Sequence, residues 1–335
     1  MPTIEFARAE DCAELLDYLV AVFRRDRPDH PRFETLYPEL FFPTDESMGL
    51  HAIVREGGRI ASCVGAYPMT LQVAGCRVPI CGIGQVSTRE DCLGRGYMSA
   101  LLKAQLARMR EQGVALAWLG GRHDRYAHFG FETAGLQFVY GLDRRSLVRY
   151  APTRAIAHVA ATAPDSITDA MFRLRERTVD SVLEPLDCYR RRLAKGGGME
   201  IWTATPSGAT EPDAWALIAT ENRAIEEWCG SPEGRMDIAA AAVEALGSLR
   251  CTEIPANQQL SELLRDHCSW MGTGVSSFCI LNRDRLLEAY RPVISDAAPL
   301  PQGEDFSRRL VRLCFGPEPS AFAPLPFLLP GPFHV

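Results

Sequence analysis

Residues 86–109 read VSTREDCLGRGYMSALLKAQLARM, and this stretch decides the fold. A short apolar strand end leads into a turn that contains Gly94 and Gly96, and an amphipathic helix follows the turn. The helical period places Met98, Leu101, Leu102, Leu106 and Met109 on one face and leaves Lys103, Arg108 and Arg110 off it. The pattern therefore predicts a strand, a glycine turn and a helix packed against a core.

The glycine turn is a candidate anion site. The first N–H groups of a helix have no intrahelical acceptor, and the helix dipole is positive at that end. Gly96 has no Cβ, so a bulky ligand can approach the backbone, and Arg95 adds a positive charge beside it. These features predict that the N-terminal half binds a cofactor that carries a pyrophosphate.

An ordinary strand–turn–helix corner explains the same two glycines, and on the glycines alone it is the more frequent explanation. The turn is not a Walker loop, because no Gly-Lys-Ser/Thr follows. It is a poor dinucleotide fingerprint, because the third glycine of that motif is missing.

A family resemblance favours the cofactor. Val86-Ser-Thr, five intervening residues and the run GRGYMSALL at 94–102 resemble motif A of the GNAT superfamily of N-acetyltransferases. Downstream, YAHFGF at 126–131 is similar to the Tyr-x-x-x-Gly-Phe segment of the same family, and the order of elements extends the resemblance to about residues 1–145. Leu93 and Met98 depart from the family pattern Gln/Arg-x-x-Gly-x-Gly/Ala, which leaves the detailed pose of the ligand open.

The resemblance implies an α/β (α+β) fold with a mixed, splayed central sheet, and acetyl-CoA as co-substrate. It assigns the pantetheine and pyrophosphate contacts to Val86, Ser87, Thr88, Leu93, Gly94, Arg95, Gly96, Tyr97, Met98 and Ser99. Tyr126 takes the family's general-acid position, where its phenol would protonate the departing thiolate. A buried core tyrosine with a hydrogen-bonded hydroxyl is the alternative for Tyr126.

The order of elements expected for the first half is strand, helix, three strands, helix, strand, short helix and strand. Gly82 and Gly84 inside the fourth strand predict a bulge there. The loop 24–46 is expected either to form one wall of the acceptor pocket or to pack as a surface loop.

We predict two domains, with a boundary near residue 150. Residues 1–150 form the acetyl-CoA-binding catalytic domain, and residues 151–335 form a degenerate GNAT-like domain with a proline-rich C-terminal tail. The prediction of a second domain rests on the order of strands and helices over 199–282, which mirrors the order in the later part of the first half. This layout is similar to a shortened form of the bacterial acetyltransferases of the enhanced-intracellular-survival type.

Composition limits the function classes. A chain of 335 residues with 47% hydrophobic and 23% charged residues suits a globular protein of two domains, and a net charge of −6 argues against general nucleic-acid binding. The 11 cysteines are scattered without a Cys-x-x-Cys pair, which favours free thiols in a reducing compartment. No signal sequence, membrane-spanning run or metal-ligand spacing is apparent, so we expect a cytoplasmic protein that does not bind membranes or metals.

The leading functional hypothesis is transfer of an acetyl group from acetyl-CoA to a primary amine of a small molecule. An acyl-CoA-binding sensor without catalysis and a protein lysine or N-terminal acetyltransferase are the alternatives, and a homo-oligomer is compatible with the sequence. Candidates for the general base are His123, Asp124, His128, Glu39 and Glu132, although a surface or capping role explains each of them equally simply. The second half is expected not to bind coenzyme A, because Pro232 and Glu233 stand at its corresponding helix entry.

Overall fold

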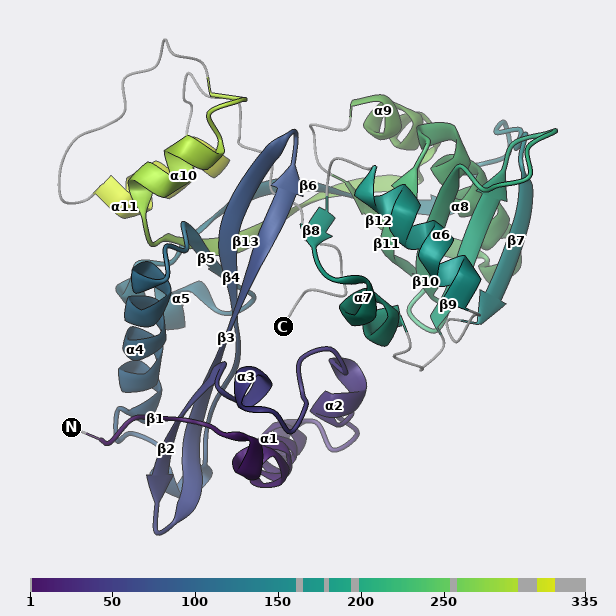
Figure 1. The fold of residues 1–335 in the computed structure, drawn as a ribbon. Coiled ribbons are helices and arrows are strands. Elements are labelled where there is room, and N and C mark those ends of the chain that lie inside the picture. Colours follow the sequence, from purple (N-terminus) through teal and green to yellow (C-terminus); the bar gives the residue numbers. More distant parts are fainter. Residues whose placement is uncertain are drawn as a thin grey trace.

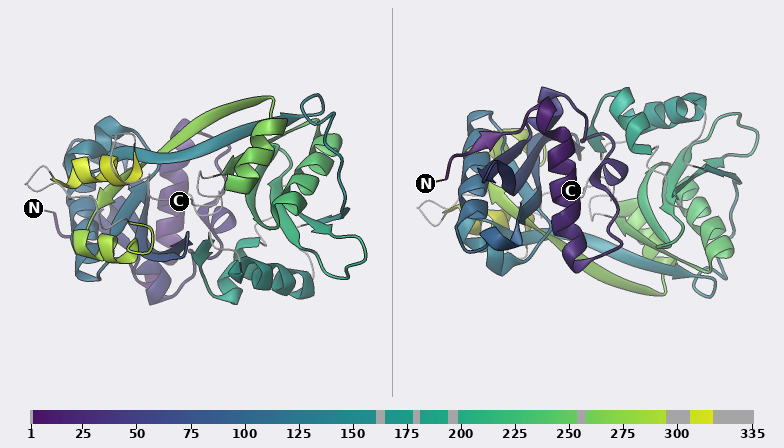
Figure 2. Two further views of the ribbon diagram at one scale, coloured as in Figure 1. Left: turned by 90° about the horizontal axis from the view of Figure 1, so that it is seen from above. Right: turned by 90° about the horizontal axis from the view of Figure 1, so that it is seen from below.

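One mixed β-sheet runs through both halves of the chain. The computed structural model describes residues 2–160, 165–177, 181–193, 199–253, 258–294 and 306–316. Within these residues the strands lie in the order β1-β2-β3-β4-β5-β13-β6-β12-β11-β10-β9-β7, and β8 pairs with β3 off this path. Figure 1 shows two lobes, with β6 and β13 crossing between them, and Figure 2 shows the same crossing from above and below.

The N-terminal lobe has the predicted order of elements. It comprises β1 (Glu5–Phe6), α1 (Cys12–Asp26), α2 (Phe33–Leu36), α3 (Asp45–Met48), β2 (His51–Glu56), β3 (Arg59–Val73), β4 (Cys76–Thr88), α4 (Tyr97–Glu111), β5 (Leu116–Leu119), α5 (His123–Tyr126) and β6 (Glu132–Asp143). The loop 24–46 contains the short helices α2 and α3 in its described part.

The two long helices of this lobe cover opposite faces of its sheet. Side chains alternate between the faces of a strand, so Ala52 and Val54 of β2 pack with α4 while Ile53 packs with α1. The predicted stripe of α4 is buried at Leu101, Leu102, Leu106 and Met109, and Met98 is partly buried against the same cluster. The helical period of the sequence thus identifies the core face of α4 correctly.

The second part of the chain contributes a second lobe and returns to the first. Its elements are β7 (Ala155–Ala160), α6 (Asp165–Glu176), β8 (Ser181–Leu183), α7 (Leu186–Leu193), β9 (Met199–Thr205), β10 (Ala214–Ala219), β11 (Ala224–Gly230), α8 (Pro232–Leu246), β12 (Ser248–Glu253), α9 (Gln258–His267), β13 (Trp270–Ile280), α10 (Arg283–Ala289) and α11 (Phe306–Phe315). The strands β7 and β8 are absent from our sequence-based assignment. The proline-rich tail from 317 onward and the glycines at 196–198 lie outside the described residues.

Strand directions show that the second lobe repeats the first. The pairs β2–β3 and β3–β4 are antiparallel and β4–β5 is parallel. In the same way, β9–β10 and β10–β11 are antiparallel and β11–β12 is parallel, with α8 in the position of α4. The repeat predicted from the order of elements is therefore present in the pairing of the strands.

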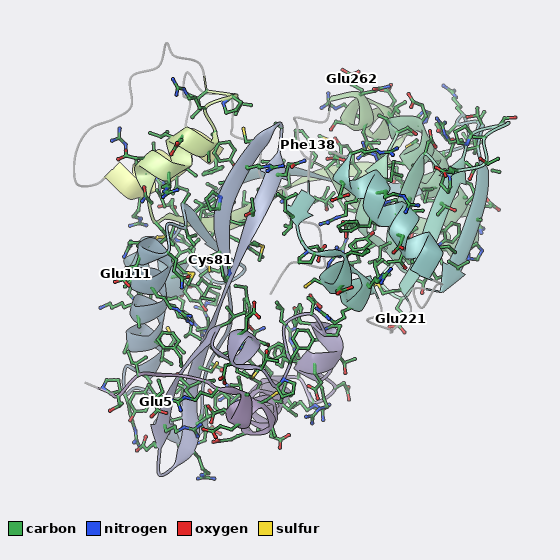
Figure 3. The ribbon with its side chains drawn as sticks, viewed as in Figure 1. Glu5, Cys81, Glu111, Phe138, Glu221 and Glu262 are labelled. Carbon is green, nitrogen blue, oxygen red and sulfur yellow. The ribbon has the colours of Figure 1, made fainter. Side chains whose placement is uncertain are left out.

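The boundary near residue 150 does not separate the two lobes. Residues 277–280 of β13 pair with β5 in the N-terminal lobe, whereas residues 138–143 of β6 pair with β12 in the second lobe. The last strand of each half thus completes the sheet of the other half. Figure 3 labels Phe138 on β6 at this crossing. The sequence reveals the strand at 277–282 but not its partner, because local patterns carry no information on pairing over such a distance.

The elements after β13 also pack on the N-terminal lobe. Leu286 and Tyr290, from α10 and its end, share one core cluster with Leu310 and Phe315 of α11. Leu71 and Trp118 of the N-terminal lobe belong to the same cluster. The N-terminal sheet therefore obtains part of its core from residues beyond 270.

All eleven cysteines lie among the described residues and are free thiols, and nine of them are buried. This confirms the prediction of buried free thiols. Within the described part of the chain, no helix is long and apolar enough to cross a membrane.

The crossing of β13 can be tested with Phe278, which is 1% exposed and stacks on Phe315 at 5.0 Å between ring centroids. We expect Phe278→Ala to lower the free energy of unfolding by about 3–5 kcal/mol, because a large core side chain is lost. The measurement is urea denaturation followed by tryptophan fluorescence. Val275→Ala on the same strand, at a position 60% exposed, is the matched control and should change the free energy by less than about 0.5 kcal/mol. Equal stabilities of the two variants would contradict the assignment of β13 to the N-terminal core.

Candidate active site

Two adjoining cavities open where β4 leaves β5. These parallel strands pair only at Ile80–Leu116, Cys81–Ala117 and Gly82–Trp118. Figure 3 labels Cys81 at this point, in the middle of the N-terminal lobe. The first cavity has a volume of about 780 Å³ and the second about 240 Å³, and Phe23, His30 and Val86 line both.

The first cavity contains every residue that we predicted to contact the cofactor. Its lining includes Val86, Ser87, Thr88, Leu93, Gly94, Arg95, Gly96, Tyr97, Met98 and Ser99. Gly94 and Gly96 have φ angles of +75° and +76°, a left-handed conformation that L side chains rarely adopt. An added Cβ on Gly96 would meet no atom within 4 Å, so the space beside it is open.

Helix α4 begins directly at this corner. Gly96 is its N-cap, and the N–H of Ala100 makes the first helical hydrogen bond, to the Gly96 carbonyl at 3.0 Å. The N–H groups of Tyr97, Met98 and Ser99 precede that bond, so the helix itself supplies no acceptor for them. The corner therefore has the geometry of an anion site, and its helix is fifteen residues long.

The positive charge of Arg95 is neutralised by a carboxylate that the sequence analysis did not identify. Its guanidinium forms an ion pair with Glu56 and donates to the Asp91 carbonyl at 3.0 Å. Glu56 also accepts from Cys92 at 3.3 Å and from Tyr97 at 3.0 Å, and these hydrogen bonds, with the charge of Arg95, lower the pKa of its carboxyl group. Arg95 is thus held in place from the β2–β3 hairpin. Arg25, Arg27 and Arg125 add further positive charge to the lining of the first cavity.

A β-bulge shapes the strand between the cavities. Cys63 pairs with Ser87 and Gly65 pairs with Gly84, so Val64 alone faces both Gln85 and Val86. Gln85 has a φ of +48°. We expected a bulge at the glycines of this strand, and the structure places it immediately after Gly84. The extra residue directs the strand away from β5 and opens the space between them.

Buried polar side chains hold the bulge, and sequence reasoning did not find them. Gln105 of α4 donates through Nε2 to the carbonyls of Leu50 at 2.8 Å and Val64 at 2.9 Å. On the other side, the Gln85 amide contacts the Tyr67 hydroxyl, which hydrogen-bonds His51 Nε2 at 2.8 Å. A glutamine within the apolar stripe of an amphipathic helix is the only sequence signal of this arrangement.

The environment of His51 fixes its protonation state. Burial lowers the pKa of His51 to about 4, and its Nδ1 lies 3.1 Å from the Met48 carbonyl. The imidazole is therefore neutral at physiological pH and serves as a fixed hydrogen-bonding partner of Tyr67. It supports the bulge and lines neither cavity in the described structure.

Tyr126 lies in the second cavity at the end of α5 and is 6% exposed. Its ring meets Phe131 edge-on, with 6.2 Å between centroids. Burial raises the pKa of Tyr126, so the phenol keeps its proton at neutral pH. A Cβ on Gly121 would come within 2.9 Å of the Tyr126 ring, so only glycine fits beside it without a shift.

None of the five candidate bases from the sequence belongs to the described lining of either cavity, and the side chains of four of them are engaged elsewhere. Glu132 pairs with Arg308 and Arg312, each at 3.1 Å, and with His123 at 3.2 Å. Asp124 forms an ion pair with Arg122 at 2.6 Å, and His128 is exposed and stacks on Phe129. The residues Glu39, Asp124, His123, His128 and Glu132 thus do not come together around Tyr126.

Glu39 affects the pKa of a residue in the second cavity without lining that cavity. Burial and then the carboxylates of Glu39 and Glu226 raise the pKa of Tyr37, which lines that cavity, to about 12. Glu226 belongs to β11, so the second lobe reaches the edge of the site. Arg191 of α7 also lies over the Phe42 ring, at 4.8 Å from its centroid. Tyr37, in the lining of the second cavity, thus lies near carboxylates from both lobes.

The corresponding corner of the second lobe is filled by the protein itself. Helix α8 starts after Ser231 with Pro232 in its first turn, and Ser231 Oγ donates to Asp213 Oδ2 at 2.7 Å. Arg154 binds the same carboxylate at 3.0 Å. A Cβ on Gly230 would collide with the Asp213 carbonyl. The carboxylate of Asp213 therefore occupies the end of α8 that would face a phosphate.

Comparison with known proteins agrees with this geometry. Residues 3–134 match the family model of the acetyltransferase (GNAT) domain. The N-terminal lobe thus resembles GNAT acetyltransferase domains in sequence. None of the curated protein sequences compared with this chain matches it.

Solved structures extend the similarity of fold to both lobes. A GCN5-related N-acetyltransferase from Kribbella flavida is 16% identical with a TM-score of 0.64, covering 86% of this chain and 74% of that one. Eis1 from Mycobacterium abscessus is 19% identical with a TM-score of 0.59, covering 86% and 76%. A tandem GNAT protein from the clavulanic acid biosynthesis pathway is 13% identical with a TM-score of 0.50, covering 84% and 99%. These similarities confirm the predicted GNAT fold with a second GNAT-like domain and the layout of the enhanced-intracellular-survival type.

The link between α4 and the bulge can be tested through Gln105. We expect Gln105→Leu to lower the free energy of unfolding by about 1–3 kcal/mol, because the buried Leu50 and Val64 carbonyls lose a donor. Urea denaturation of the full chain measures this change. The matched control is Gln112→Leu at the exposed end of the same helix, which should stay within about 0.5 kcal/mol of the parent. A Gln105 variant as stable as the control would show that the bulge does not depend on this side chain.

Proposed function

We propose that the chain transfers an acetyl group from acetyl-CoA to a primary amine of a small molecule. One observation carries the proposal: the glycine corner and Tyr126 line two cavities that meet at Val86. A pyrophosphate at the corner and a thioester at the start of the second cavity would place the departing sulfur on the side of Tyr126.

The donor site takes its role from the backbone of the corner. The N–H groups that begin α4 bind the pyrophosphate, and the open space beside Gly96 admits it. The strand from Val86 to Thr88 offers its backbone to the pantetheine arm. The arginines in the lining of the first cavity supply the positive charge that phosphates require.

Tyr126 acts as the general acid in this proposal. Attack by the amine nitrogen on the thioester carbon breaks the C–S bond, and the sulfur needs a proton as it leaves. The raised pKa of Tyr126 keeps that proton available at neutral pH. Its position at the end of α5, fixed by Phe131 and Gly121, supports this role.

The second cavity is suited to a small cationic acceptor. A volume of about 240 Å³ holds a small molecule or one side chain, and the carboxylates of Glu39 and Glu226 attract an ammonium group. We propose that the second lobe closes this cavity through Glu226 and binds no coenzyme A, since Asp213 fills the end of α8.

A panel of amines tests the choice among the hypotheses. Acetyl-CoA is incubated with benzylamine, cadaverine, spermidine and a lysine-containing peptide, and thiol release is followed. Turnover with the free amines supports the proposal, and turnover with the peptide alone favours a protein acetyltransferase. Binding of acetyl-CoA by calorimetry without turnover on any acceptor favours the sensor.

The donor site is tested by Gly96→Val. A β-branched side chain would enter the phosphate space and strain a backbone at φ +76°, so we expect the affinity for coenzyme A to fall at least about tenfold. Isothermal titration calorimetry measures the affinity. The matched control is Gly75→Val, which has a φ of +78° and similar open space in the β3–β4 turn away from both cavities. Unchanged affinity in the Gly96 variant would refute the donor site.

The acid is tested by Tyr126→Phe, which keeps the ring and removes the proton donor. We expect turnover to fall about 10²-fold or more, while the affinity for coenzyme A stays within twofold. Steady-state kinetics with the best amine of the panel measures the effect. Tyr189→Phe removes another buried phenol outside both cavities and should leave turnover unchanged. Turnover at the parent level in the Tyr126 variant would leave only a packing role for that residue.

A further inference from the structure

His30 lies where the two cavities meet. It follows α1, and its side chain lines both the first and the second cavity. The ring is held between aromatic neighbours, at 5.5 Å from the Phe23 centroid and 5.1 Å from the Phe33 centroid. Its backbone is held as well, because Arg24 Nε donates to the His30 carbonyl at 2.9 Å. The imidazole therefore has a defined position beside the junction.

The hydrogen bonding of the ring selects one tautomer. Nδ1 lies 2.7 Å from the Pro31 carbonyl oxygen, which can only accept a hydrogen bond. Nδ1 therefore carries the proton in the neutral ring, and Nε2 carries a lone pair. The described residues make no hydrogen bond to Nε2. A neutral imidazole held in this way is prepared to accept a proton.

The other titratable groups of the second cavity cannot take this role. Besides His30, the described lining contains only two titratable side chains, Tyr37 and Tyr126. Burial raises the pKa of both, with the carboxylates near Tyr37 adding to its shift, so both phenols stay protonated at neutral pH. The five candidate bases from the sequence line neither cavity in the described structure.

The charged and titratable groups facing His30 come from every element around it. They are Arg24 and Arg25 on α1, Arg27 in the following loop, Tyr37 after α2, Cys92, Arg95 and Tyr97 at the glycine corner, and Arg125 and Tyr126 on α5. The charged members of this set that line the cavities are arginines, whereas carboxylates from both lobes lie near Tyr37.

We propose that His30 Nε2 is the general base of the acetyl transfer. This inference rests on the proposed function. An acceptor that enters as an ammonium ion first loses one proton to solvent. Nε2 then takes a proton from the neutral amine nitrogen while the nitrogen lone pair forms the bond to the thioester carbon. The C–S bond breaks, and its electron pair leaves with the sulfur, which takes the proton of Tyr126. Return of the proton from the imidazolium to the phenolate restores both residues, so that one proton has moved from nitrogen to sulfur.

The test is His30→Gln, assayed with acetyl-CoA and the fastest free amine among benzylamine, cadaverine and spermidine. We expect kcat to fall about 10²- to 10⁴-fold and the acidic limb of the kcat pH profile to disappear. Coenzyme A affinity by calorimetry should stay within about threefold, which also reports that the variant is folded. His128→Gln, at an exposed ring outside both cavities, is the matched control and should keep the parent profile.

A chemical rescue separates a base from a packing residue. His30→Ala leaves room for free imidazole. After subtraction of the rate without enzyme, we expect added imidazole to raise the kcat of this variant at least fivefold and to raise the kcat of the parent by less. His30→Asn serves as a second variant with the same expectation as His30→Gln. A parent pH profile in these variants, loss of coenzyme A binding in all of them, or absence of rescue would overturn the assignment.

Failure of the proposed function gives a different result. In that case the parent protein itself transfers no acetyl group to any amine of the panel, and the base has no reaction to serve. When the parent is active, only the His30 variants decide the identity of the base.

Discussion

The site depends on the separation of two parallel strands. The strands β4 and β5 share three residue pairs and then diverge, and the bulge at Gln85 and Val86 turns β4 away. A strand that leaves its neighbour exposes backbone groups, which are costly to bury without partners. Gln105 satisfies part of this demand from α4, and Ser62 Oγ donates to the Ser87 carbonyl at 2.8 Å. Hydrogen bonds from Gln105 and Ser62 thus support the strands beside the opening.

The second lobe has the same arrangement of strands and helix with a different corner. Both lobes share the directions of four strands and a fifteen-residue helix that starts after the third of them. At α4 two glycines leave the helix end open, whereas at α8 the carboxylate of Asp213 lies at the end and Arg154 binds it. The two corners therefore differ at only a few residues. The second lobe instead places Glu226 near Tyr37, which lines the second cavity.

Much of the N-terminal lobe could be predicted from the sequence. The helical stripe of α4 and the alternation of β2 and β3 are local patterns, and they identify the buried faces. The glycine corner and Tyr126 could be found because their spacing resembles that of a known family. The bulge in β4 was expected from its glycines, although glycine permits a bulge without fixing its register.

Other features require the three-dimensional arrangement. The strand β13 pairs with β5 across about 160 residues of sequence, which no local pattern specifies. His30 lies in a segment whose apolar residues show no helical or strand period. Its position at the junction of the two cavities follows from the packing of its ring against Phe33. The contribution of Glu226 arises only when the two lobes meet. Such long-range contacts explain why the lining of the first cavity could be predicted better than that of the second.

A crystal structure of the full chain with coenzyme A tests the central claim most directly. The account predicts one coenzyme A per chain, with its pyrophosphate at the N-terminus of α4 and its thiol at the junction of the two cavities near Tyr126. Coenzyme A at the N-terminus of α8, or bound away from the α4 corner, would contradict the account.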